Sequence, residues 1–250
     1  MGKVAVFIDR DGTINQETGY VDSFDRFHIL PRIPDAIKRL NENNIQAIII
    51  TNQSGVARGY FTIDFVNKLH EKMGKELERK NCSVDGVYTC PHHPDEGCAC
   101  RKPKPGMLLK AAREHNISLH RSYVIGDKII DIKTAHSVGA KGILVLTGYG
   151  AEEIKSVTKD SEDRPDHVAP NLYEAVTWVL RQAGGNTPTP STSLRAGPTL
   201  PHQGGGSSAD LYGRSPYLPS PLAGEGKGGG DKADRRILIV KLLVTCPKAL

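Results

Sequence analysis

Short runs of apolar residues, rich in isoleucine and valine, alternate with longer helical patterns over the first 183 residues. Such runs are typical of strands buried on both faces, as in parallel sheets. The expected strands are Val4–Ile8, Ile45–Ile50, Val84–Tyr88, Tyr123–Ile125 and Ile143–Leu146. The expected helices are Pro34–Asn43, Thr62–Lys80, Pro105–His115, Ile129–Val138 and Asn171–Gln182. Because strands and helices alternate, the sequence predicts a doubly wound parallel α/β sheet of Rossmann-like type.

The composition divides the chain into residues 1–183, expected to form one folded domain, and an extension over residues 184–250. The segment between the first strand and Pro34 is too short for a large inserted cap domain. Residues 184–230 contain 12 Gly and 7 Pro with little periodicity, so we expect the extension to be disordered.

Charge and hydropathy narrow the classes of partner. Residues 1–183 hold 25 Lys/Arg against 24 Asp/Glu, which gives no electrostatic footprint for nucleic acid. A local basic cleft for a small phosphorylated molecule remains compatible with that balance. No signal-peptide pattern is visible, and no apolar run reaches the roughly 18 residues that span a bilayer. We therefore expect a cytoplasmic monomer that binds a small molecule and neither membrane nor nucleic acid.

Acidic and polar residues follow the expected strands at one edge of the sheet. The first strand leads into Asp9-Arg10-Asp11-Gly12-Thr13, the second into Thr51, and the fourth into Gly126-Asp127. Ligands of open α/β sheets bind at the carboxyl ends of the strands. Buried strands avoid charge, so carboxylates at these ends indicate a metal, a phosphoryl group or both.

These residue types suit phosphoryl transfer to a carboxylate. Asp9 is the expected nucleophile, and Asp11 the acid and base for the leaving group and the water. Mg²⁺ prefers oxygen ligands, which Asp9, the backbone carbonyl of Asp11, and Asp127 would supply. Thr51 would donate to phosphoryl oxygens and Lys102 would neutralise developing charge, both catalytic roles.

Each of these residues also has an ordinary structural explanation. Thr51-Asn52 is compatible with a simple turn, and Asp127 or Asp131 with capping of the next helix. Such ordinary explanations rarely apply together at several consecutive strand ends, so the sequence favours an active site.

A second cluster of chemistry-bearing residues lies in a loop rich in proline and glycine. Cys90, Cys98 and Cys100 fall within eleven residues, and His92 or His93 adds an imidazole by spacing alone. Three thiolates and one imidazole form a closed set suited to structural Zn²⁺. Because Arg101 and Lys102 follow directly, the metal is expected to fix the loop that aims these two side chains at a substrate phosphate.

With these motifs in view, the chain resembles the haloacid dehalogenase superfamily, and within it the D-glycero-D-manno-heptose 1,7-bisphosphate 7-phosphatases. The resemblance runs from about Val4 to Gln182. It rests on Phe7–Asn15, Gly19–Val21, Thr51–Gly59, Cys90–Pro94, Cys98–Pro103 and Gly126–Lys128.

The resemblance implies the activity, the metals and the site. It implies Asp9 as nucleophile and Asp11 as acid/base, with Mg²⁺ bound by Asp9, Asp11 and Asp127. It favours His92 as the zinc ligand beside the three cysteines. The implied substrate contacts are Glu17, Thr18, Gly19, Tyr20, Thr51, Asn52, Gln53, Ser54, Arg101, Lys102 and Lys128.

Three alternatives differ from this interpretation. Histidinol-phosphate phosphatases are close relatives with a similar zinc loop, although the segments Gly19–Val21 and Ser54–Gly59 are more like those of the heptose enzymes. A receiver-type signalling module also phosphorylates an aspartate, but it needs no carboxylate at the position of Asp11. A zinc-dependent nucleic-acid module is disfavoured by the near-neutral charge of residues 1–183.

Overall fold

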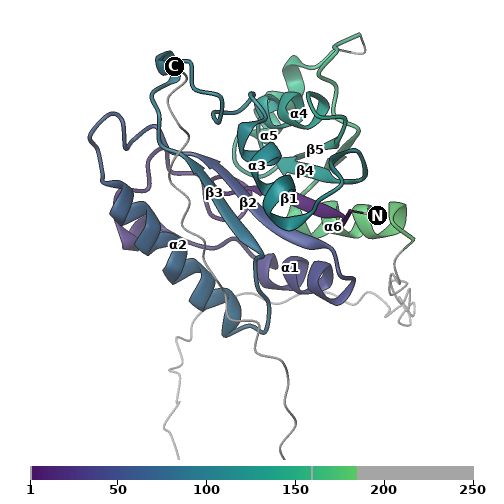
Figure 1. Ribbon diagram of the computed structural model, residues 1–250, viewed down its shortest axis with the longest axis horizontal. Coiled ribbons are helices and arrows are strands. Elements are labelled where there is room, and N and C mark those ends of the chain that lie inside the picture. Colours follow the sequence, from purple (N-terminus) through teal and green to yellow (C-terminus); the bar gives the residue numbers. More distant parts are fainter. Residues whose placement is uncertain (1, 159, 185–250) are drawn as a thin grey trace, which may run out of the picture. The chain divides into compact units, whose positions relative to one another are not determined.

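Six parallel strands form a single sheet in the order β3-β2-β1-β4-β5-β6 in the computed structural model, which describes residues 2–158 and 160–184 (Figure 1). The strands are β1 (Ala5–Asp9), β2 (Gln46–Asn52), β3 (Gly86–Cys90), β4 (Tyr123–Gly126), β5 (Lys141–Val145) and β6 (His167–Ala169). The five predicted strands are confirmed, with ends shifted by at most two residues. The sequence missed β6, which has three residues and an exposed central valine, and therefore no apolar run.

The helices also match the periodicity of the sequence. They are α1 (Ile33–Glu42), α2 (Ile63–Glu78), α3 (Gly106–His115), α4 (Ile129–His136), α5 (Gly150–Glu153) and α6 (Leu172–Gln182). All five predicted helices are confirmed, and α5 is a short addition. The side chains of Thr62 and Asn171 accept hydrogen bonds from Phe65 N and Glu174 N, so each caps its helix.

Helices cover both faces of the sheet, as the alternation predicted (Figure 1). Every residue of β1 is buried, and its side chains alternate between the two faces. Val6 and Ile8 belong to a core with apolar residues of α1, α2 and α6. Ala5 and Phe7 belong to a second core with residues of α3 and α4. The central strand therefore anchors both layers and fixes the place where its carboxyl end emerges.

That carboxyl end lies at the switch point of the sheet. The chain passes from β1 to β2 and β3 on one side, then returns to place β4, β5 and β6 on the other. Crevices for ligands form where the strand order reverses in this way. Between β1 and α1 the only helical element is the 3₁₀ turn Phe24–Arg26, so the described residues contain no inserted cap domain there.

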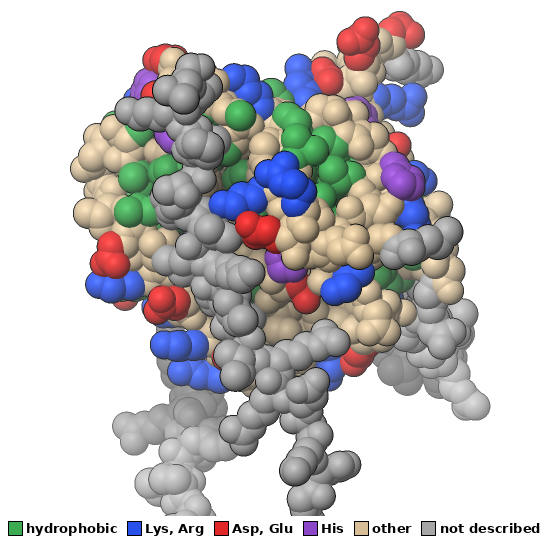
Figure 2. All heavy atoms as spheres, in the orientation of Figure 1, with side chains coloured by type: hydrophobic (Ala, Val, Ile, Leu, Met, Phe, Trp, Pro, Cys, Tyr) green, Lys and Arg blue, Asp and Glu red, His purple; other side chains and the backbone are tan. Residues whose placement is uncertain are grey.

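Two further observations concern the surface and the helices. Acidic and basic side chains are interspersed among the described residues on the face shown in Figure 2. No helix within the described ranges has both the length and the apolar character needed to cross a membrane. The expected extension over residues 184–250 lies outside the described residues, apart from Gly184.

Candidate active site

Three buried carboxylates meet at the carboxyl edge of the sheet. Asp9 ends β1, Asp127 follows β4, and Asp131 lies in the first turn of α4. One carboxylate oxygen from each lies within 4.8 Å of the others, which is close enough to share a metal ion. We call these residues the aspartate trio. The sequence predicted Asp9 and Asp127 as ligands, and capping of the next helix was the ordinary explanation that it offered for Asp131.

Lys102 places a positive charge beside two members of the aspartate trio. Its Nζ lies 2.7 Å from Asp9 Oδ1 and 2.6 Å from Asp131 Oδ1. The side chain is only 2% exposed, and although burial opposes ionisation, the carboxylates of Asp131 and Asp9 raise the pKa of Lys102. The ammonium group is therefore permanently charged beside the expected nucleophile.

The amide of Asn52 holds the backbone of Lys102 in place. Asn52 Nδ2 donates to the Lys102 carbonyl at 3.2 Å, and its Oδ1 accepts from the Lys102 N–H at 3.1 Å. The end of β2 is thereby tied to a segment fifty residues further along the chain. Asn52 was expected to contact substrate, and the structure places both of its amide atoms on Lys102.

The environment of the aspartate trio fits a cation. Burial raises the pKa of Asp9 to about 6, although Lys102 opposes the shift. Burial and the charge of Asp9 raise the pKa of Asp127 to about 8. Asp127 Oδ2 accepts from the Tyr149 N–H at 2.8 Å, whereas its buried Oδ1 has no hydrogen-bond partner among the residues that the structure describes. A divalent cation would satisfy that oxygen and relieve the repulsion.

Glycines make room for Asp127. Gly12 and Gly148 both have a positive φ, and a Cβ at either position would overlap the Asp127 carboxylate. The Gly-Thr sequence after Asp11 and the loop after β5 therefore have a steric reason to contain glycine here.

The Asp11 carboxylate is turned toward a separate network. Arg10 donates to both of its oxygens, with Nη2 at 2.8 and 2.7 Å and Nε at 3.0 Å from Oδ1. Asn15 Nδ2 and Gln53 Nε2 add bonds of 3.0 and 2.8 Å. Although burial opposes it, Arg10 and these amides lower the pKa of Asp11. Its side chain is 18% exposed, so the carboxylate remains accessible from the edge of the sheet.

Thr51 and Gln53 lie next to each other at the end of β2. Gln53 Nε2 lies 2.7 Å from Thr51 Oγ1 and so links Thr51 to Asp11. Ser54 is also largely buried. Within the described part of the chain, Arg101 Nη1 is a buried donor with no hydrogen-bond partner.

A cavity of about 460 Å³ lies beside this edge, lined by Gln16, Glu17, Thr18, Gly19, Leu30, Gly148 and Tyr149. Lys128 Nζ lies 3.5 Å from Glu17 Oε2 and 4.4 Å from the centre of the Tyr149 ring. Tyr20 packs edge-on against Tyr60, with ring centres 4.9 Å apart. The predicted contact residues Glu17, Thr18 and Gly19 thus line one cavity together with Tyr149. Lys128 contacts two of the lining residues, Glu17 and Tyr149.

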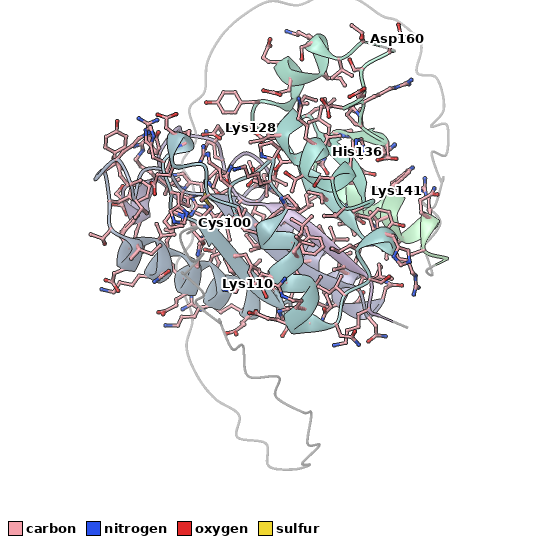
Figure 3. The ribbon with its side chains drawn as sticks, turned by 45° about the horizontal axis from the view of Figure 1, so that its top comes forward. Cys100, Lys110, Lys128, His136, Lys141 and Asp160 are labelled. Carbon is pink, nitrogen blue, oxygen red and sulfur yellow. The ribbon has the colours of Figure 1, made fainter. Side chains whose placement is uncertain are left out.

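The four expected soft ligands converge in the loop after β3. Cys98 Sγ lies 3.6 Å from the sulfurs of Cys90 and Cys100, and His92 Nδ1 lies 3.3 Å from Cys100 Sγ. These separations suit the ligands of a tetrahedral metal with Zn–S bonds of about 2.3 Å. The interaction with Cys100 lowers the pKa of the Cys90 thiol to about 5, which favours the thiolate. We call Cys90, His92, Cys98 and Cys100 the metal loop (Figure 3 labels Cys100, and Lys128 at the start of α4).

His93 lies outside the metal loop. Its Nδ1 lies 3.1 Å from Asp95 Oδ2 and accepts a hydrogen bond from Asp95 N, so it helps to cap the turn Pro94–Glu96. The structure therefore resolves the choice that spacing alone left open and places His92 with the cysteines.

The comparisons with known proteins agree with this geometry. A HAD-hydrolase-like family model matches residues 99–175. Together with the parallel sheet and the aspartates at its carboxyl edge, the match defines a hydrolase of the haloacid dehalogenase type.

Two relatives carry the same name, D-glycero-beta-D-manno-heptose-1,7-bisphosphate 7-phosphatase. The one from Yersinia pestis is 43% identical over 179 residues, which cover 68% of this chain and 92% of the relative. The one from Haemophilus ducreyi is 39% identical over 72% of this chain and 100% of its own length. The crystal structure of D,D-heptose 1,7-bisphosphate phosphatase from B. bronchiseptica, complexed with magnesium and phosphate, matches with a TM-score of 0.66 and 35% identity, over 72% of this chain and 99% of that one. The chain therefore belongs to the heptose-1,7-bisphosphate 7-phosphatase family.

Proposed function

We propose that this enzyme is a Mg²⁺-dependent phosphatase that removes the 7-phosphate of D-glycero-D-manno-heptose 1,7-bisphosphate through an aspartyl-phosphate on Asp9. The observation that carries the proposal is the salt bridge of 2.7 Å between Asp9 and Lys102, within a trio of buried carboxylates. The relatives that share at least 39% of their residues with this chain bear the name of that activity.

The reaction consists of two phosphoryl transfers, first to Asp9 and then to water, and each is coupled to one proton transfer. An oxygen of Asp9 bonds to phosphorus while the bond from phosphorus to the sugar oxygen breaks, and Asp11 gives its proton to that oxygen. Asp11 then takes a proton from a water molecule whose oxygen attacks phosphorus, which releases phosphate and restores Asp9. The bonds from Arg10 favour the ionised Asp11 of the second step, whereas a phosphate dianion beside it favours the protonated form of the first.

The metals have separate roles. Asp9, Asp127 and the backbone carbonyl of Asp11 are the proposed ligands of Mg²⁺, and Asp131 lies close enough to join them directly or through water. Mg²⁺ bound there would neutralise negative charge on the phosphoryl oxygens during transfer. Zn²⁺ is the proposed occupant of the metal loop, where four protein ligands leave no open position for catalysis.

The remaining residues bind and orient the substrate. Thr51 donates to phosphoryl oxygens, and Lys102 neutralises charge as it develops. The further proposed contacts are Glu17, Thr18, Gly19, Tyr20, Asn52, Gln53, Ser54, Arg101 and Lys128. Among these, the unpartnered buried Nη1 of Arg101 suits the second, non-reacting phosphate as a fixed donor. From the sequence we also propose that the enzyme acts as a monomer in the cytoplasm.

A substrate panel tests the proposal. Phosphate release is measured with both anomers of the heptose bisphosphate, histidinol phosphate and fructose 1,6-bisphosphate, each with and without Mg²⁺. We expect the highest kcat/KM for a heptose bisphosphate, with the anomeric phosphate left in place. Faster hydrolysis of histidinol phosphate would move the enzyme to the rival family.

An arginine variant tests how the second phosphate is bound. Arg101→Ala should lower kcat/KM far more for the bisphosphate than for a heptose monophosphate, because remote binding energy aligns the reacting phosphate. Arg113→Ala, an exposed position in the last turn of α3, is the matched control. Equal losses on the two substrates would contradict this role.

A further inference from the structure

An arginine between the two catalytic aspartates is fully buried. Arg10 is 0% exposed, although arginine is almost never completely buried without partners. Three of its hydrogen bonds go to the Asp11 carboxylate. A further one joins Nη1 to Nε2 of His70, at 3.2 Å. The guanidinium thus connects the first strand end to a residue sixty positions away.

His70 occupies an unusual place in α2. The buried face of this helix otherwise consists of Val66, Leu69, Met73, Gly74 and Leu77. A leucine at position 70 would continue that apolar face, whereas the imidazole is 3% exposed and faces a charged guanidinium. A polar side chain in this position needs a reason beyond packing.

The chemistry of the pair fixes the state of the ring. A guanidinium has only donors, so His70 Nε2 accepts and the proton of the neutral imidazole lies on Nδ1. Burial and the charge of Arg10 lower the pKa of His70 to about 3, in agreement with a neutral ring. His70 is therefore an acceptor and contributes no charge.

The hydrogen bond between His70 and Arg10 affects the orientation of the Asp11 side chain. An aspartate side chain has several staggered rotamers, and here the fork of Arg10 holds one of them. We propose that His70 is a positioning residue: by accepting a hydrogen bond from Arg10, it fixes the guanidinium that places the Asp11 carboxylate for proton transfer. This inference rests on the role of Asp11 given under the proposed function.

Two substrates with different leaving groups distinguish a loss of Asp11 positioning from a general loss of protein stability. A sugar oxygen needs a proton as it departs, whereas p-nitrophenolate departs without one, and kcat/KM reports the steps up to that departure. We compare p-nitrophenyl phosphate with the sugar phosphate that the wild-type enzyme hydrolyses fastest. His70→Leu should lower kcat/KM at least tenfold for the sugar phosphate and less than threefold for p-nitrophenyl phosphate.

Three further variants complete the experiment. His70→Gln, whose amide oxygen can accept from Arg10, should restore the sugar phosphate rate to within about threefold of wild type. Leu69→Ala, a fully buried neighbour in α2, should lower the melting temperature and affect the two substrates equally. Where His70→Leu does not fold, His70→Met replaces it as an apolar side chain of flexible shape.

The outcomes are distinct. Equal losses on the two substrates in His70→Leu, unchanged kinetics, or no recovery in His70→Gln would overturn the role of His70. Asp11→Asn is the reference, because it removes the proton transfer itself. If Asp11→Asn slows both substrates equally, the role of Asp11 as acid is wrong, and the role of His70 falls with it.

Discussion

Replacing Lys102 by methionine removes a charge and keeps most of the volume of the side chain. In the wild-type enzyme, Nζ lies within 2.7 Å of two buried carboxylates. In Lys102→Met, Asp9 and Asp131 would face each other and Asp127 without a cation. Breaking a buried ion pair by removing one partner costs about 3–5 kcal/mol. For a domain of this size each kcal/mol shifts the melting temperature by about 2–4 °C, so a decrease of roughly 6–20 °C is expected.

The effect on catalysis is separable from the effect on stability. Loss of one preorganised charge or donor in an active site lowers kcat by about 10²–10³. Steady-state phosphate release with saturating Mg²⁺ measures this, and thermal melts without Mg²⁺ measure stability. Because a cation also relieves the repulsion, Mg²⁺ should reduce the deficit in melting temperature without restoring kcat.

The pH dependence provides a further check on the same variant. The folded form of a buried carboxyl group with a raised pKa binds more protons than the unfolded form, so its stability falls as pH rises. The stability deficit of Lys102→Met should therefore be larger at pH 8 than at pH 5. Lys104→Met is the control, because Lys104 is exposed and its ammonium group donates to the backbone carbonyl of Gly97. A kcat within tenfold of wild type, or a melting temperature within 3 °C, would refute the reasoning.

Three other predictions concern the metal loop, His70 and the residues after Gly184. Zinc should co-purify at about one ion per chain and be lost in Cys98→Ser but retained in Cys82→Ser, as elemental analysis would show; zinc-free wild-type protein purified without chelators would contradict this. Because the pKa of His70 is lowered to about 3, the unfolded chain binds a proton that the folded one does not between about pH 6.5 and 3. The free energy of unfolding should therefore decrease by up to about 1.4 kcal/mol for each unit by which the pH is lowered in this range, as urea unfolding would measure. The decrease should be less steep in His70→Gln. Truncation after Gly184 should leave kcat and melting temperature within error, since a relative aligned over its whole length covers 72% of this chain; a loss of more than a few degrees would show that later residues dock on the domain.

The fold was largely predictable because its signals are local. The apolar run before Asp9 identifies a buried strand, and Thr62 identifies the start of α2. The strand β6 was missed because its pairing with β5 depends on tertiary contacts and not on an apolar run of its own.

The site was predictable where residues follow strand ends, and less so where distant segments meet. Asp131 has the sequence context of a cap, and its side chain does accept from the Lys128 N–H, but the same carboxylate also contacts Lys102. The pairing of Asn52 with Lys102 and that of His70 with Arg10 span fifty and sixty residues. No spacing rule reports such pairs. A polar residue within an apolar helical face was the one signal that could have identified His70.

The most direct test of the central claim is to trap the phosphoryl group on the enzyme. The enzyme is mixed with substrate and Mg²⁺, quenched in acid within one turnover, digested with trypsin and analysed by mass spectrometry. The account predicts a phosphoryl adduct on the peptide Val4–Arg10, which contains Asp9 as its only carboxylate side chain. The adduct should be absent in Asp9→Asn and should accumulate in Asp11→Asn with p-nitrophenyl phosphate, because the water that releases it is no longer deprotonated. An adduct on another peptide, or turnover by Asp9→Asn within tenfold of wild type, would contradict the account.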